Sequence, residues 1–351
     1  MDTRQFEGRK REHIQHALNP AHQAQGRSGL DLIHLHHEAL PELNFEEIRL
    51  DAVCLNKPSA TPFYVAGMTA GHADAMDLNQ RLALACQARG WAMGVGSQRR
   101  DLEAREDGVL QEWRRLRARV PQLTLFANLG ISQLISTPVS EIRRLVDAIE
   151  AQALVVHLNV LQEALQPEGT PQFKGGLAAL RKICVELGVP VVVKETGCGF
   201  SFGTLKRLSE IGLAAVDVSG LGGTHWGRIE GARAASMSLQ AQAAETFAVW
   251  GESTVDSVIA AHQALLGTTE IWASGGVRTG LDAAKLIALG AHRVGYAQPA
   301  LQAAIEGDEA LDRWMLQQEF DLKVALLCTG AASPEILRKK EDKWTKRTSN
   351  I

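Results

Sequence analysis

The feature that most constrains the fold is a series of eight short apolar segments, each followed by a polar or glycine-containing loop and then a helix-like pattern. The segments begin at Thr61, Trp91, Leu123, Ala153, Pro190, Ala214, Glu270 and His292. Their continuous apolar character is typical of parallel strands that are covered on both faces. Most successive segments begin roughly 22 to 37 residues apart, the length of a strand–helix–strand unit. Eight such units predict a (β/α)8 barrel.

An open, doubly wound sheet is the alternative architecture. Such a sheet usually has fewer strands, and its first strand is followed by a GxGxxG turn that is absent here. Residues 1–60 precede the first barrel strand, and a hairpin is expected near residues 48–58. We expect this N-terminal extension to cover the mouth of a barrel formed by residues 61–351. A longer insertion, rich in Ala and Gln, separates the sixth and seventh strands.

Composition excludes several classes of protein. The formal net charge is −3, so no overall field favours nucleic acid or an acidic membrane. The N-terminal residues are charged and polar, unlike a secretory signal, and no run approaches the roughly 18 apolar residues of a membrane helix. The five cysteines contain no CxxC pair, which argues against disulfides or a zinc site. These features predict a cytoplasmic protein that neither binds nucleic acid nor inserts into membranes.

Polar residues and glycines gather where the predicted strands end, while the strand bodies stay apolar. The carboxyl ends of barrel strands form the active site in this fold. We therefore expect the site to contain Gly67-Met68-Thr69, Ser97-Gln98-Arg99, Asn128, the group His157, Asn159, Gln162 and Glu163, then Lys194, Ser219, Gly222-Gly223-Thr224, residues 274–278, and Ala297-Gln298.

The loops after the last two strands, SGGVRTG and GYAQPAL, favour a phosphate site. Their glycines allow backbone amides to approach an anion, a helix begins after each loop, and Arg278 adds a positive charge. Loops after strands seven and eight usually bind phosphate in this fold. The alternative interpretation is that the glycines only form tight turns.

Several side chains have both a functional and a structural interpretation. Lys194 stabilises negative charge on a flavin or is a structural cation. Glu163 binds magnesium together with ligand phosphates and waters, or is a solvated charge. His157 contacts an anion or is a core histidine. Arg9 and His13 share a helix face and either clamp a diphosphate or form a solvated helix end.

Together these stretches resemble the type 2, flavin-dependent isopentenyl-diphosphate isomerases over nearly the whole chain. The RKxxH start, formed by Arg9, Lys10 and His13, and the run HLNVLQEALQPEG carry the specific part of the resemblance. The SGGVRTG loop is shared with many flavin barrels. The resemblance implies a (β/α)8 barrel that binds FMN and Mg²⁺ and interconverts isopentenyl and dimethylallyl diphosphate. It also implies reduced flavin maintained by NADPH or NADH, and assembly into homo-oligomers, often tetramers or octamers.

The resemblance further implies roles for individual residues. FMN would contact Gly67, Met68, Thr69, Ser97, Asn128, Lys194, Ser219, Thr224, Gly276, Arg278, Ala297 and Gln298. The substrate would contact Arg9, Lys10, His13, Ser97, Gln98, Arg99, His157, Asn159 and Gln162, with Glu163 holding Mg²⁺. No pair of carboxylates stands out as an acid and a base, so Gln162 and Glu230 are the candidate catalytic side chains beside the flavin.

Three positions depart from the family pattern: Ala70, His36 and His225. Ala70 replaces a glycine near the flavin, and His225 adds a titratable group near the site. Two rival functions are the alternatives to this activity. A flavin-dependent 2-hydroxy-acid oxidase or dehydrogenase needs a histidine next to an arginine, typically NHGGRQ, which the comparable loop lacks. A non-catalytic flavin- or phosphate-binding barrel would lack the magnesium and diphosphate ligands.

Overall fold

Eight parallel strands close into a barrel in the computed structural model, which describes residues 12–68, 73–103, 108–265, 267 and 269–348. The barrel strands are β4 (Phe63–Val65), β5 (Ala92–Gly94), β6 (Leu125–Gly130), β7 (Ala153–Leu158), β8 (Val191–Glu195), β9 (Ala215–Asp217), β10 (Glu270–Ala273) and β11 (Arg293–Tyr296). Each lies within one of the predicted segments. Strand β11 pairs with β4 and closes the barrel, so the predicted architecture is confirmed and an open sheet is excluded.

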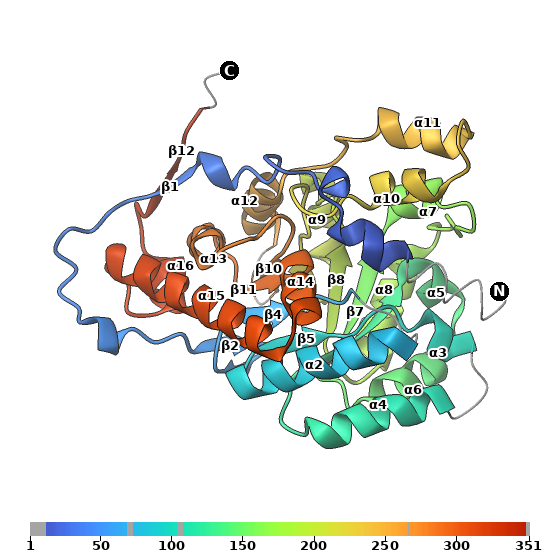
Figure 1. Ribbon diagram of the computed structural model, residues 1–351, viewed down its shortest axis with the longest axis horizontal. Coiled ribbons are helices and arrows are strands. Elements are labelled where there is room, and N and C mark those ends of the chain that lie inside the picture. The colour runs from blue at the N-terminus through green and yellow to red at the C-terminus, as the bar shows by residue number, and fades with distance from the viewer. Residues whose placement is uncertain (1–11, 69–72, 104–107, 266, 268, 349–351) are drawn as a thin grey trace.

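Helices surround the barrel (Figure 1). In chain order they are α2 (Ala73–Arg89), α3 (Arg99–Glu103), α4 (Gly108–Arg119), α5 (Ile131–Ser136), α6 (Val139–Ala148), α7 (Val160–Leu165), α8 (Gly176–Glu186), α9 (Phe202–Leu208), α10 (Trp226–Arg233), α11 (Leu239–Thr246), α12 (Thr254–Ala264), α13 (Gly280–Ala288), α14 (Gln298–Glu306), α15 (Asp308–Cys328) and α16 (Pro334–Lys339). The insertion between β9 and β10 forms α10, α11 and α12.

The strands are apolar throughout because both of their faces are covered. One face packs against the helices: α6, for example, buries Ile142, Leu145 and Val146, which are spaced to share one side of the helix. The other face fills the barrel interior with large rings. Phe126 and Trp272 are each 1% exposed, and their ring centroids lie 5.1 Å apart. The barrel is therefore a packed core rather than a channel.

The N-terminal extension contacts both ends of the barrel. The predicted hairpin is present as β2 (Ala52–Cys54) and β3 (Lys57–Ser59), antiparallel to each other. The backbone N–H of Leu55 in its turn donates to Glu270 at the start of β10, at 2.7 Å. The hairpin therefore lies at the amino ends of the strands, opposite the expected site.

Earlier parts of the extension lie at the carboxyl ends. Residues 12–18 are helical, and the loop that follows pairs with the loop after β9. The backbone N–H of Ala24 donates to Gly223 and that of His225 to His22, both at 2.8 Å. The 3-10 helix η1 (Pro20–His22) belongs to this part of the chain, which lies at the mouth of the barrel. The 3-10 helices η2 (Leu30–Leu32) and η3 (Phe45–Glu47) follow further along the extension, and η3 packs against α15.

A strand that the sequence did not predict ties the two ends of the chain together. Strand β12 (Trp344–Lys346) pairs antiparallel with β1 (Ile33–Leu35), so Ile33 lies opposite Lys346. Next to this pairing, Nδ1 of His36 lies 2.6 Å from the carbonyl oxygen of Asp342. This contact gives a structural account of the unusual histidine. The division of the chain at residue 60 stays a prediction. Strand β12, from the end of the sequence, pairs with the extension and not with the barrel strands.

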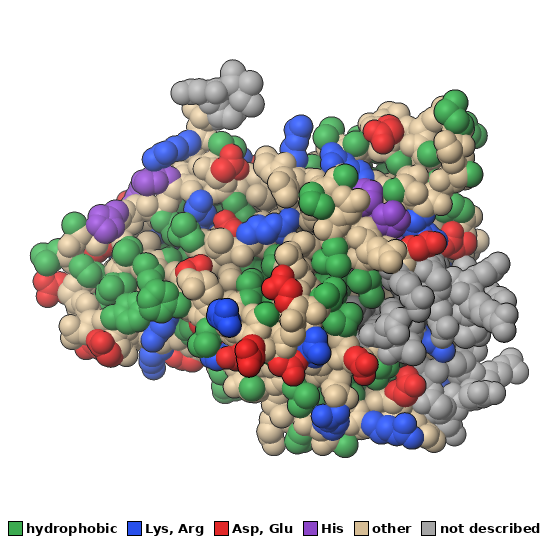
Figure 2. All heavy atoms as spheres, viewed as in Figure 1, with side chains coloured by type: hydrophobic (Ala, Val, Ile, Leu, Met, Phe, Trp, Pro, Cys, Tyr) green, Lys and Arg blue, Asp and Glu red, His purple; other side chains and the backbone are tan. Residues whose placement is uncertain are grey.

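The surface carries both signs of charge. Lys, Arg, Asp and Glu side chains are interspersed on the face shown in Figure 2. Among the described residues, no helix combines the length and the apolar character needed to span a bilayer.

Candidate functional site: two adjoining pockets at the mouth of the barrel

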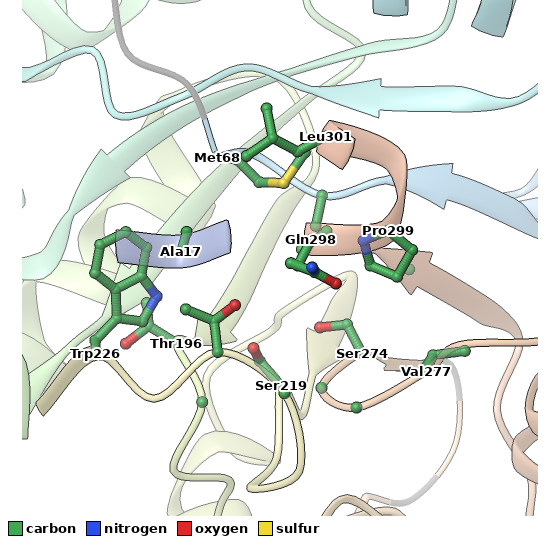
Figure 3. A pocket seen from close by; sticks show the side chains of 18 of the residues that line it. Ala17, Met68, Thr196, Ser219, Trp226, Ser274, Val277, Gln298, Pro299 and Leu301 are labelled. Carbon is green, nitrogen blue, oxygen red and sulfur yellow. The ribbon is translucent and has the colours of Figure 1, made fainter. Parts of the chain in front are cut away.

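A pocket of about 940 Å³, counted with the space open to solvent at its mouth, lies over the carboxyl ends of the strands (Figure 3). Seven glycines contribute to its lining: Gly67, Gly197, Gly220, Gly223, Gly275, Gly276 and Gly295. We call it the glycine-lined pocket. Met68, Leu301 and Trp226 supply apolar walls, and Ser219, Ser274 and Gln298 supply polar groups. A volume and lining of this kind suit a cofactor or another small organic ligand.

The glycines after β9 and β10 pack directly against one another. A Cβ atom on Gly275 would lie 2.1 Å from the carbonyl oxygen of Gly220, and one on Gly223 would lie 2.7 Å from the backbone nitrogen of Gly276. Gly275 and Gly276 also have φ values of +99° and +73°, which other residues adopt only with strain. These glycines therefore fix the shape of the pocket by allowing two loops to touch, in addition to forming turns.

One end of the glycine-lined pocket fits a phosphate group. Within the described residues, the backbone N–H groups of Gly276 and Val277 donate no hydrogen bond to the protein, and both residues line the pocket. The N-terminus of α14 begins at Gln298 on the same wall. Burial lowers the pKa of the Arg278 guanidinium, whose Nη2 donates to Oε1 of Gln23 at 3.0 Å. Free amides, a helix terminus and a partly buried arginine together suit an anion.

A buried polar network supports the floor of this pocket. Nζ of Lys194 donates to the carbonyl oxygen of Glu195 at 2.7 Å, and Lys194 lies opposite Asp217 on the neighbouring strand. Asp217 accepts hydrogen bonds from Tyr64 at 2.5 Å and from Ser274 at 2.8 Å. Burial lowers the pKa of Lys194 while the carboxylates of Asp217 and Glu195 oppose the shift. The amine of Lys194 is thus held among these groups at the floor of the pocket, whose lining it joins.

A second pocket of about 780 Å³, again counted with its open mouth, adjoins the first. The two share His13, Gly67, Met68, Lys194, Thr196 and Trp226. The rest of its lining is almost entirely polar: Ser97, Arg99, Asn128, Gln133, His157, Asn159, Gln162, Glu163 and Gln166. We call it the polar pocket. The rings of His13 and Trp226 meet edge to face with centroids 5.2 Å apart and form part of the shared wall.

Hydrogen bonds connect the side chains that follow β7. Nδ1 of His157 lies 2.9 Å from Oδ1 of Asn128. Nδ2 of Asn159 donates to Oε1 of Gln162 at 3.2 Å and to Oε1 of Glu163 at 3.0 Å. The other oxygen of Glu163 accepts from the backbone N–H of Thr170 at 2.6 Å. Asn159, the residue directly before α7, therefore orients Gln162 and Glu163 in the first turn of that helix.

Glu163 fits a single-carboxylate metal ligand. Its two oxygens each accept internal hydrogen bonds, but a carboxylate offers about four lone-pair positions, so room for a cation remains. Among the described residues, no group of three or more His, Cys, Asp or Glu side chains is arranged to bind a metal. A metal here would need oxygen atoms from a ligand and from water, which is the usual arrangement for magnesium.

Glu230 lies behind the polar pocket and is fully buried. Its Oε1 accepts from Nε2 of Gln162 at 2.9 Å and lies 3.0 Å from Nε2 of His13, and its Oε2 pairs with Arg233 at 2.6 Å. Burial alone would raise the pKa of Glu230, but His13, Gln162 and Arg233 together lower it to about 2. Glu230 is therefore an ionised group that touches the pocket lining through Gln162 and His13.

Most of the predicted site residues line one of the two pockets. Gln98 does not: it is 1% exposed, and its Oε1 accepts from the backbone N–H of Asn128 at 3.1 Å. Arg9, Lys10, Thr69 and Ala70 lie outside the described residues. His225 is buried and caps the N-terminus of α10, where Nδ1 accepts from the N–H of Arg228 at 3.1 Å. Burial lowers its pKa, so it acts as a neutral structural group.

Sequence reasoning missed several residues of the site. Asp217 was detectable as a charge inside an apolar strand. Ser219, in contrast, was predicted, and the structure adds a φ of +37°, a strained conformation often found at functional sites. Thr196, Gln133 and Trp226 line the pockets without a distinctive motif.

The fold and the glycine-lined pocket define the class of FMN-dependent barrel enzymes: the family model described as FMN-dependent dehydrogenase matches residues 111–341. The chain is 51% identical over 341 residues to the isopentenyl-diphosphate delta-isomerase of Bdellovibrio bacteriovorus, covering 96% of this chain and 97% of that protein. It is 39% identical over 345 residues to that of Halobacterium salinarum, covering 97% and 94%. The chain belongs to the isopentenyl-diphosphate delta-isomerase family.

Solved structures of oxidases share the fold at low sequence identity. Lactate oxidase from Pediococcus acidilactici superposes with a TM-score of 0.68 and 16% identity over 99% of this chain and 96% of that chain. A mandelate oxidase complex gives 0.67 and 16% over 97% and 95%. At 16% identity the likeness to these oxidases is one of fold.

Proposed function

We propose that this chain interconverts isopentenyl and dimethylallyl diphosphate as an FMN-dependent isomerase. The observation that carries the proposal is the adjacency of the two pockets. A glycine-lined pocket that suits a flavin and its phosphate shares a wall with a polar pocket built from the HLNVLQE run. The family membership and this arrangement support the same activity.

The residues of the glycine-lined pocket would hold FMN. The amides of Gly276 and Val277, with Arg278, would bind its phosphate, and Lys194 would lie near its ring system. When bound in the reduced state, FMN supplies a proton-transferring group beside the substrate. The lining residues position and shield it, because apolar walls such as Met68 and Trp226 exclude water.

The residues of the polar pocket would bind and orient the substrate. Double-bond migration adds a proton to one alkene carbon and removes another from a neighbouring carbon. His157 and Arg99 would contact the diphosphate, and Gln162 would lie near the reacting carbons. A carboxyl group with a pKa of about 2 holds a proton poorly near neutral pH, so Glu230 would act by orienting Gln162.

Several finer features remain part of the proposal. Glu163 would hold Mg²⁺ against the diphosphate, and NADPH would keep the flavin reduced. Arg9 and Lys10 would add positive charge to the diphosphate site, so Arg9→Ala and Lys10→Ala should raise KM and leave FMN affinity unchanged. A homo-oligomer, as a tetramer or octamer, and a cytoplasmic location are further predictions, testable by light scattering and by cell fractionation.

The direct test is a purified protein assayed for bound flavin and for isomerisation. We expect a flavin absorbance spectrum and conversion of isopentenyl to dimethylallyl diphosphate when dithionite or NADPH is present with Mg²⁺. L-lactate and mandelate should not reduce the bound flavin. A protein that binds no FMN, or one that binds FMN and oxidises these hydroxy acids without isomerising the diphosphate, would refute the proposal.

A further inference from the structure

Arg233, at the last position of α10, holds three carboxylates from three separate segments. Its side chain is 10% exposed, and its nitrogens lie 2.9 Å from Glu12, 2.9 Å from Glu168 and 2.6 Å from Glu230. Burial alone would lower the pKa of the guanidinium, but these three carboxylates raise it, so it remains charged. One buried cation therefore joins α10 to two other parts of the chain, through Glu12 and Glu168.

Each partner of Arg233 leads to the polar pocket. Glu230 contacts Gln162 and His13, and both of these residues line that pocket. Glu12 directly precedes His13 in the helical part of the N-terminal extension. Glu168 lies in the loop that folds back on α7, where a Cβ on Gly169 would meet the carbonyl oxygen of Glu163 at 2.1 Å. The guanidinium thus joins the extension, the loop after α7 and the carboxylate behind Gln162.

The contact with Glu230 also fixes which way the Gln162 amide points. Its Nε2 donates to Glu230 at 2.9 Å, and its Oε1 accepts from Asn159 at 3.2 Å. With Oε2 of Glu230 paired to Arg233, its Oε1 is held as the acceptor for Gln162. His13 and Gln162 also lower the pKa of Glu230. Loss of Arg233 removes the third of these partners, so the carboxyl group would take up a proton more readily and would be free to turn away from Gln162.

We propose that Arg233 is a positioning residue for the isomerase reaction: through Glu12 it holds the helical residues 12–18 beside the polar pocket, and through Glu230 it keeps the carboxamide of Gln162 in one orientation at the wall of that pocket. This inference rests on the proposed function. Two separate effects follow. Loss of the Glu12 contact weakens substrate binding, and loss of the Glu230 contact slows the reacting step.

The test compares Arg233→Met, Arg233→Lys and Glu12→Gln with a control, Arg89→Met. Arg89 also pairs with two carboxylates, Asp312 at 2.8 Å and Glu319 at 3.5 Å, but it connects α2 with α15 and lines neither pocket. Its loss should lower stability and leave both kinetic constants unchanged. All four variants should retain FMN, because none of these side chains lines the glycine-lined pocket.

For Arg233→Met we expect kcat to fall about 100-fold and the acidic limb of the pH profile of kcat to move to higher pH, since the pKa of Glu230 rises without its cation. Glu12→Gln should raise KM about threefold with kcat unchanged. Arg233→Lys keeps the charge without the bidentate geometry of the guanidinium and should recover part of kcat. Backbone amide hydrogen exchange in residues 12–18 should be faster in Arg233→Met and Glu12→Gln than in the wild type.

The outcomes separate this inference from the proposed function. Equal kinetics and equal exchange rates in Arg233→Lys, Glu12→Gln and the Arg89→Met control would overturn the positioning role, even if Arg233→Met itself failed to fold. A wild-type protein without isomerase activity would refute the proposed function, and the exchange rates would still report whether Arg233 holds residues 12–18.

Discussion

The two adjoining pockets are built by different means. In the glycine-lined pocket the shape comes from backbone: loops after β9 and β10 touch through Gly220, Gly223, Gly275 and Gly276. In the polar pocket it comes from side chains that hold one another, as Asn159 holds Gln162 and Glu163. A backbone-built site keeps its shape but tolerates no added atom. A side-chain-built site tolerates substitution while losing orientation. Damage to the first should therefore remove the cofactor, and damage to the second should slow the reaction with the cofactor retained.

The largest expected effect comes from adding one methyl group to the backbone-built pocket. Gly275→Ala would place Cβ 2.1 Å from the carbonyl oxygen of Gly220 at a φ of +99°. We expect the free energy of unfolding to fall by about 3 kcal/mol and FMN binding to be lost, as measured by urea unfolding and flavin fluorescence. Gly175→Ala is the matched control, because its φ is +92° and no atom lies within 4 Å of the new Cβ. It should destabilise by about 1 kcal/mol with FMN binding intact.

The second test addresses the side-chain-built pocket. Gln162→Ala removes the amide that Asn159 and Glu230 orient, and kcat should fall about 100-fold at an unchanged magnesium requirement. Glu163→Gln removes one charge at nearly the same shape, and the Mg²⁺ concentration for half-maximal activity should rise about tenfold. The flavin spectrum should stay unchanged in both variants. Full activity and an unaltered Mg²⁺ titration in Glu163→Gln would return this glutamate to the role of a solvated charge.

Arg278→Ala tests the one charged side chain at the phosphate end of the glycine-lined pocket. Loss of a charge-assisted contact should weaken FMN binding by about 1.5–3 kcal/mol, measured by fluorescence titration of the apoprotein. Arg181→Ala, which removes an exposed side chain of α8, serves as the control for loss of a positive charge. If Arg278→Ala binds FMN as tightly as the control, the phosphate lies elsewhere.

The smallest expected effect concerns His225, the buried N-cap residue of α10 that directly precedes the shared wall residue Trp226. Its pKa is lowered in the folded state from an ordinary value of 6.5. The unfolded chain therefore takes up a proton first as the pH falls, and the stability that neutral His225 contributes declines below about pH 6.5. His225→Asn keeps an N-cap acceptor for α10 and should show a smaller loss of unfolding free energy between pH 7.5 and pH 5. An identical loss in both proteins would contradict this role.

The barrel and most pocket residues could be predicted because both follow from local patterns. Continuous apolar runs predict the strands. Closure of the barrel brings the strand ends together regardless of how the outer helices pack. The pairing of β1 with β12 could not be predicted, because each strand is only three residues long and carries no local signal of its partner. Two partners of Arg233 were equally hidden, because Glu12 and Glu168 lie far from it in the sequence. Glu230 was predicted with Gln162 as a catalytic candidate, but its burial and its low pKa depend on neighbours that only the tertiary structure brings close.

The pairing of β1 with β12 has a consequence for how this protein can be recombined. The extension that reaches the mouth of the barrel is tethered by residues from the opposite terminus, with Leu35 beside Trp344. A chimera that takes residues 1–60 from a relative must therefore take residues 344–346 from the same relative. Swapping the front of the chain alone would leave its anchor strand mismatched. The two termini form one exchangeable unit, although the whole barrel separates them in the sequence.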